Sequence, residues 1–209
     1  SMEEVRRKIE DYKHIESTEY KANLKHFIGS IVPVAEEQGI RLAIHPDDPP
    51  WPLMGLPKAL STLKDAQEII EAYDSPNNGI TFCTGSFGAA KSNDLPLMAE
   101  ELAHRINFAH LRNVSRDEHL NFHEAQFLKG DIDMANIMST LVRENIQRYK
   151  NNPDFRGIPV RPDHGARILG DFSIDSYPGY PLYGRLKNLA EIAGLETGLL
   201  YSISHSKAT

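Results

Sequence analysis

Short apolar runs alternate with helix-periodic segments along this chain, and this alternation constrains its fold more than any other feature. The apolar runs lie at 41–44, 80–83, 106–110 and 158–161. Between and around them, apolar residues recur at the spacing of one helix face, at 18–38, 62–73, 94–104, 133–149 and 182–193. Strands that alternate with helices indicate βαβ units. The sequence therefore predicts an α/β fold with a parallel sheet.

Local signals set the ends of these elements. Thr62 and Asp65 form the S/T-x-x-D/E pattern of a helix start, and Gly39 follows the segment 18–38 as a stop. Pro33 lies inside that segment, so we expect it to kink or locally open the helix. Prolines follow His45 closely and cannot continue a central strand. A loop is therefore expected to begin at His45.

Each predicted strand ends at a side chain that can bind a metal ion. These side chains are His45, Cys83, His110 and Asp163. The carboxyl ends of parallel strands carry the βα loops, where functional groups gather. A single His or Cys at a strand end is more often structural, but four such residues at equivalent positions favour a joint role. Imidazole, thiolate and carboxylate together suit Mn, Fe, Co or Zn, so we predict a divalent-metal site.

The loops that follow these residues contain further groups suited to proton transfer or to binding an anion. They are Asp47, Asp48, Arg112, Asn113, His123, Glu124, His164, Tyr180, Tyr183 and Arg185. Taken singly, each is equally compatible with a solvated turn, a helix start or aromatic packing. They become candidates for the functional site only because they follow the predicted metal ligands in the chain.

Composition narrows the classes of binding partner and the cellular compartment that we expect for this chain. A net charge of −6 argues against nucleic acid as the main partner, because binding phosphate usually needs a basic surface. The single cysteine excludes an intrachain disulfide and suits a reducing compartment. No apolar run approaches the roughly 18 residues of a membrane span, and the N-terminus lacks the apolar region of a signal peptide. We therefore expect a cytoplasmic protein without a membrane partner.

The number of strands leaves the sheet incomplete. Four strands are half of an eight-stranded barrel, which typically takes about 250 residues, and an isolated half would leave two strand edges unpaired. We expect one domain over 1–209, with an N-terminal helical segment at 1–15 and βα units carrying the metal site at 16–209. Either a second copy, as in a homo-oligomer, or a further segment would complete the sheet.

Seven short motifs occur in a fixed order along the chain. They are His-Pro-Asp-Asp-Pro-Pro at 45–50, Cys-Thr-Gly-Ser at 83–86, His-Leu-Arg at 110–112, Phe-His-Glu-Ala at 122–125, Gly-Asp-x-Asp-Met at 130–134, Arg-Pro-Asp-His-Gly at 161–165 and Pro-Gly-Tyr at 178–180. Together they resemble the mannonate dehydratase family over nearly the whole chain. The resemblance implies a (β/α)8 TIM barrel of the xylose-isomerase-like type, of which this chain supplies about four βα units from the C-terminal part.

The resemblance also implies a cofactor and a reaction. Mn²⁺ or Fe²⁺ would be held by the four strand-end residues, and D-mannonate would lose water to give 2-keto-3-deoxy-D-gluconate, a step of hexuronate (glucuronate) catabolism. His164 and Tyr180 match residues that the family is thought to use for proton transfer. The predicted substrate contacts are Arg112, Asn113, His123, Glu124 and Arg185.

Two alternatives stay open at this point. The first is a metal-dependent sugar isomerase or epimerase on the same type of barrel, although such enzymes usually have a ligand set richer in carboxylates. The second is a metal-binding fragment without activity, because family members carry a long N-terminal portion with the first barrel strands, which this chain lacks.

Overall fold

The computed structural model describes residues 1–206. Its elements follow one another as α1 (Met2–Tyr12), α2 (Ser17–Glu37), β1 (Leu42–Ile44), α3 (Leu63–Glu71), β2 (Asn78–Cys83), α4 (Thr84–Ala89), α5 (Leu95–Leu102), η1 (Ala103–Arg105), β3 (Ile106–His110), β4 (Val114–Arg116), β5 (Phe122–Glu124), α6 (Met134–Asn151), β6 (Val160–Arg161), η2 (Leu169–Ser173) and α7 (Leu182–His205). Helices and strands alternate through most of this order, as predicted.

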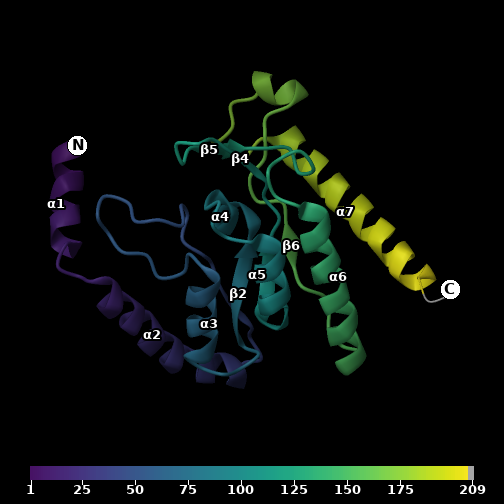
Figure 1. The fold of residues 1–209 in the computed structure, drawn as a ribbon, viewed down its shortest axis with the longest axis horizontal. Helices are drawn as coiled ribbons and strands as arrows, with labels where there is room; N and C mark the ends of the chain where they lie inside the picture. The colour runs from purple at the N-terminus through teal and green to yellow at the C-terminus, as the bar shows by residue number, and fades with distance from the viewer. Residues whose placement is uncertain (207–209) are drawn as a thin grey trace.

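A four-stranded parallel sheet, in the order β1-β2-β3-β6, forms the centre of the fold (Figure 1). The α/β class with a parallel sheet is thereby confirmed. The register pairs Cys83 with His110, and His110 with Arg161. The carboxyl ends of β2, β3 and β6 therefore lie in one row across the sheet.

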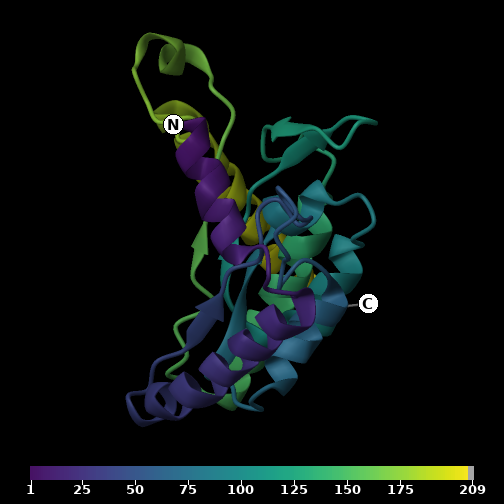
Figure 2. The same ribbon diagram turned by 90° about the vertical axis from the view of Figure 1, so that its left-hand side faces the viewer.

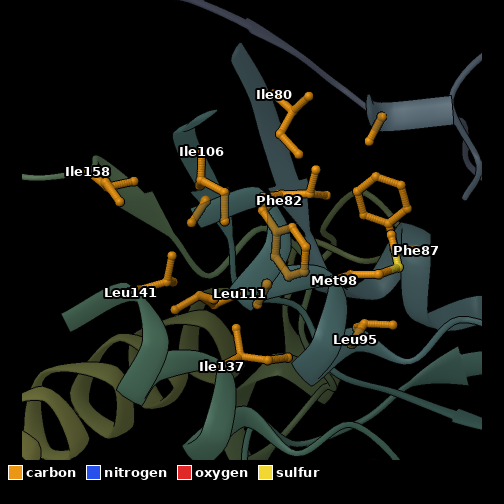
Figure 3. Close-up of a cluster of buried hydrophobic side chains, with 14 of the residues drawn as sticks. Ile80, Phe82, Phe87, Leu95, Met98, Ile106, Leu111, Ile137, Leu141 and Ile158 are labelled. Carbon is orange, nitrogen blue, oxygen red and sulfur yellow. The ribbon is translucent and has the colours of Figure 1, made fainter. Parts of the chain in front are cut away.

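Helices cover one face of this sheet. Ile80 and Phe82 of β2 and Ile106 of β3 are fully buried and pack with apolar residues of α3, α5 and α6 (Figure 3). Because side chains alternate along a strand, Thr81 and Cys83 point to the opposite face. That face carries the polar residues at the carboxyl ends of the strands.

Hydrogen bonds at both ends of α3 determine where this helix begins and ends. Thr62 and Asp65 form the predicted capping box at its start. The fully buried Asn78 donates from Nδ2 to the carbonyls of Ile69, Ile70 and Tyr73 at its end. This polar residue opens β2 two positions before the apolar run that predicted the strand.

Other predicted boundaries need correction. The expected strand at 158–161 is limited to Val160–Arg161, because the N–H of Ile158 donates to the side chain of Asn145. The last helix does not stop at 193. It continues to His205, since Leu195 and Leu199 still pack against the core. The helix α2 continues through Pro33 to Glu37, and Gly39 follows it with a φ of 64°.

Besides the 3-10 segment η2, a short helix and a hairpin had no sequence prediction. A short helix, α4, begins at Thr84, directly after β2. The segment predicted as a long polar loop contains the antiparallel hairpin β4–β5. Its Phe122 contacts Trp51 edge to face, and its turn is closed by Asp117, which accepts N–H bonds from His119 and Asn121.

The hairpin and the segment with η2 lie at the same end of the molecule, beyond the carboxyl ends of the strands (Figures 1 and 2). At one side α1 stands apart from the body and has no buried residue (Figure 1). Among the helices within residues 1–206, none combines the length and the apolar character that a membrane crossing requires.

Phe82→Ala tests the position of the core. Phe82 is fully buried, so its loss should lower the free energy of unfolding by about 3–5 kcal/mol, measured by urea denaturation. The matched control is Phe172→Ala, because Phe172 is 72% exposed. A comparable loss in both variants would contradict this description of the core.

Candidate functional site

Three metal-capable side chains meet at the carboxyl ends of β1, β2 and β3. They are His45, Cys83 and His110, whose ligand atoms all lie within 4.8 Å of one another. Nε2 of His45 is 3.2 Å from Nδ1 of His110. Ligands bound at about 2.0–2.3 Å to one ion would lie at similar separations. The geometry therefore fits a divalent metal bound by imidazole and thiolate groups, which agrees with the prediction from the strand ends.

The tautomer of His45 supports this fit. Its Nδ1 lies 2.7 Å from the carbonyl oxygen of Pro46, which can only accept a hydrogen bond. Nδ1 therefore carries the proton, and Nε2 presents a lone pair toward His110. A backbone carbonyl that fixes the non-ligating nitrogen in this way is common around metal-binding histidines.

Asp163, the predicted fourth ligand, lies beside this group. Its Oδ2 is 3.7 Å from Nδ1 of His110, and its Oδ1 is 3.2 Å from the guanidinium of Arg161. The residue follows β6 with a φ of 54°, a left-handed conformation that Asp tolerates better than most residues. This turn brings the carboxylate of Asp163, which is 6% exposed, to the row formed by Cys83 and His110.

Burial controls the protonation of two of these groups. It raises the pKa of the Cys83 thiol to about 11, although Ser86 opposes the rise by donating to Sγ at 3.0 Å. Burial also lowers the pKa of His110 to about 4, against the opposing effect of Asp163. Without a metal, the cysteine is therefore a thiol and His110 is neutral near pH 7.

Arg112 forms the second part of the site. It is 3% exposed, and its guanidinium donates to both carboxylate oxygens of Glu124 and to Oδ2 of Asp48 at 2.5 Å. Burial alone would lower its pKa, but Glu124 and Asp48 raise it above the ordinary value. Its side chain passes over Gly85, where an added Cβ would stand 2.4 Å from Cδ of Arg112. The absence of a side chain at Gly85 is therefore required.

His164 and Tyr180, the predicted proton-transfer pair, are in contact. Nε2 of His164 lies 3.2 Å from the hydroxyl of Tyr180, which is itself 3.5 Å from Oδ1 of Asp163. Nδ1 of His164 lies 2.8 Å from Oε1 of Glu124. Arg185 donates from Nε to the carbonyl of Asp163, and its guanidinium lies over the Tyr180 ring. These groups extend the metal-capable cluster into one continuous polar site.

Other predicted residues have different surroundings. Asn113 is buried and holds the loop after β5, by donating to the carbonyls of Phe127 and Ile132. His123 is exposed and alternates with Glu124 along β5, so its side chain points away from His164. The structure therefore does not bring Asn113 or His123 into the polar site.

Asp47 and Tyr183 also have structural surroundings. Asp47 accepts the backbone N–H groups of Ala59 and Leu60, and so closes the loop after β1. Tyr183 packs against Gly170, and its N–H donates to Asp171.

Besides Ser86, two polar residues of the site had no sequence prediction. Arg161 contacts Asp163, and Thr84 donates to the carbonyls of His110 and Arg112. Both belong to motifs already noted, at 161–165 and 83–86. The sequence signal that could have identified them is a polar residue close to a predicted metal ligand.

Comparison with known proteins decides the family. The family model described as D-mannonate dehydratase (UxuA) matches residues 1–206. The chain belongs to this family. It is 50% identical to the mannonate dehydratase of Chromohalobacter salexigens over 200 residues, and 43% identical to that of Rhizobium meliloti over 205 residues, which covers 95% and 97% of the chain.

A solved structure gives the same result. The mannonate dehydratase from Streptococcus suis serotype 2 superposes with a TM-score of 0.83 at 38% identity, covering 94% of this chain and 54% of that one. This chain spans about half the length of the curated relatives it matches, 51% in each of the two named above.

Proton release on metal binding tests the state of Cys83. Since the thiol has a pKa of about 11 and His110 is already neutral, binding Mn²⁺ near pH 7 should release about one proton, and affinity should rise with pH. Calorimetry in buffers of different ionisation enthalpy measures this number. Cys83→Ala should bind more weakly and release none, and equal release by both proteins would exclude Cys83 as a ligand.

Proposed function

We propose that this chain supplies the metal-binding part of a mannonate dehydratase, which converts D-mannonate to 2-keto-3-deoxy-D-gluconate and water. The observation that carries the proposal is the contact of His164 and Tyr180 beside Asp163 and the cluster of His45, Cys83 and His110. This reaction needs a group that takes a proton, a group that gives one and a cation that stabilises negative charge. The site combines candidates for all three.

The proposed fold of the working protein is a xylose-isomerase-like (β/α)8 TIM barrel, to which this chain contributes about four βα units. Three features support it. Within residues 1–206, β1 and β6 are the outer strands of the parallel sheet, the face opposite the helices carries the polar site, and the relatives are about twice as long. Closing a barrel would remove both edges and enclose that polar face.

His45, Cys83, His110 and Asp163 are the proposed ligands of Mn²⁺ or Fe²⁺. When bound, the ion would stabilise the negative charge that develops on the substrate carboxylate as the C2 proton leaves. The ligand set of imidazole, thiolate and carboxylate suits either metal. His45 and His110 already present ring nitrogens to each other at 3.2 Å.

His164 and Tyr180 are the proposed proton-transfer residues. One takes the proton from C2, and the other protonates the hydroxyl that leaves C3. Their contact at 3.2 Å allows a proton to pass between them after each reaction and so restore both groups.

Among the predicted substrate contacts, Arg185 has the position best suited to an anion, because its guanidinium lies over Tyr180. Arg112 is already paired with Glu124 and Asp48. Contacts of Arg112, Asn113, His123 and Glu124 with substrate stay predictions, as do a cytoplasmic location, a homo-oligomeric state and a place in hexuronate catabolism.

An assay with D-mannonate tests this proposal. The Mn²⁺-loaded 209-residue chain, and a full-length protein that contains it, are incubated with D-mannonate, and the 2-keto-3-deoxy acid is measured. Loss of one proton-transfer group typically costs about 10²–10⁴-fold in rate, so Tyr180→Phe should lower kcat by that range.

Tyr177→Phe is the matched control, because this neighbouring tyrosine is 77% exposed, and its kcat should not change. If the full-length protein isomerises a neutral sugar and leaves mannonate unchanged, the proposed function is wrong.

A further inference from the structure

The two ring nitrogens of His164 face chemically different partners. Nδ1 lies 2.8 Å from Oε1 of Glu124, and Nε2 lies 3.2 Å from the hydroxyl of Tyr180. A carboxylate paired with a guanidinium can only accept a hydrogen bond, whereas a hydroxyl can donate or accept. The proton of a neutral His164 ring therefore belongs on Nδ1, and Nε2 carries a lone pair that accepts from Tyr180, because the other acceptor near that hydroxyl, Oδ1 of Asp163, is farther away at 3.5 Å.

Arg112 holds the carboxylate of Glu124, which determines the tautomer of His164. Its Nε lies 3.1 and 3.0 Å from the two oxygens of Glu124, and its Nη2 lies 2.8 Å from Oε1. Such charge-assisted pairs define the plane and direction of a carboxylate more tightly than a single bond does. Because Asp48 accepts from Nη1, the guanidinium is itself held between the loop after β1 and the hairpin β4–β5.

The ring of His164 is also confined by its neighbours. Gly179 lies so close that an added Cβ would be 3.2 Å from Nδ1, and the Tyr180 ring packs edge-on with centroids 4.7 Å apart. A ring flip would place Cδ2 and Cε1 where Nδ1 and Nε2 now lie, and would therefore remove the hydrogen bonds to both Glu124 and Tyr180. Packing and hydrogen bonding therefore select the same orientation.

We propose that Glu124 is a positioning residue, which fixes His164 in the Nδ1–H tautomer and so keeps Nε2 free to exchange a proton with Tyr180. Arg112 holds Glu124 in the required direction. This inference rests on the proposed function only in taking His164 as a proton-transfer residue. It differs from a contact between Glu124 and substrate, because Glu124 acts through the imidazole of His164.

The tautomer can be measured directly on the 209-residue chain. With ¹⁵N-labelled histidine, metal-free, at about pH 8 where an ordinary imidazole is neutral, long-range ¹H–¹⁵N correlation shows which ring nitrogen carries the proton. His164→Gln assigns the signal. We expect Nδ1–H in the parent, and in Glu124→Ala a tautomer ratio changed by about tenfold or more, because a hydrogen bond to a charged group is lost.

Glu118→Ala is the matched control, since it removes an exposed carboxylate from the same hairpin and should leave the tautomer unchanged. Unchanged signals from the other histidines would show that Glu124→Ala keeps its fold. An Nε2–H ring in the parent would overturn the proposal, whether or not the variant folds.

Kinetics on the full-length protein separate the proposal from a role in substrate binding. Glu124→Ala should lower kcat and leave KM nearly unchanged, and Glu118→Ala should change neither. A higher KM with unchanged kcat and tautomer would make Glu124 a substrate contact instead. Absence of mannonate turnover in the parent, with the expected tautomer present, would contradict the proposed function and leave the positioning of His164 intact.

Discussion

The parallel pairing of β2, β3 and β6 places Cys83 opposite His110, and His110 opposite Arg161. The rest of the site depends on this register. Because side chains alternate along a strand, a shift by one residue would turn Cys83 or His110 toward the helices. The buried residues Ile80 and Phe82 of β2 prevent such a shift, since it would move them out of the core (Figure 3), and the buried Ala109, next to His110, does the same for β3. Packing on one face thus fixes the chemistry on the other.

Arg112 connects the loops around the site to one another and to the strand ends. It joins the loop after β1 through Asp48 and the hairpin through Glu124, and Glu124 in turn contacts His164 in the loop after β6. Removing a guanidinium from water is costly unless carboxylates accept its hydrogen bonds. The two carboxylates meet that need, so the loops are coupled through one buried residue.

The sequence predicted the parts of the site that follow directly from strand ends. His45, Cys83 and His110 each lie at the end of an apolar run, and parallel pairing brings such ends together without further information. The helix start at Thr62 was equally predictable, because a capping box is a local interaction. Family motifs named His164 and Tyr180, which are in contact.

What the sequence did not predict depends on contacts between distant segments. The hairpin is short and polar, so its pattern resembles a loop, and without it nothing separates Glu124 from His123. Their alternation along β5 places one residue against His164 and the other in solvent. The extra length of α7 likewise comes from packing on the core, which no local stop signal reveals.

The strand ends are proposed to form one metal site that includes the thiolate of Cys83. X-ray absorption at the Mn edge of the Mn²⁺-loaded chain tests it most directly, because sulfur lies farther from a bound metal than nitrogen or oxygen does. We expect one sulfur ligand together with nitrogen and oxygen ligands, and loss of the sulfur signal in Cys83→Ala. A shell of oxygen and nitrogen alone in the parent would contradict this proposal.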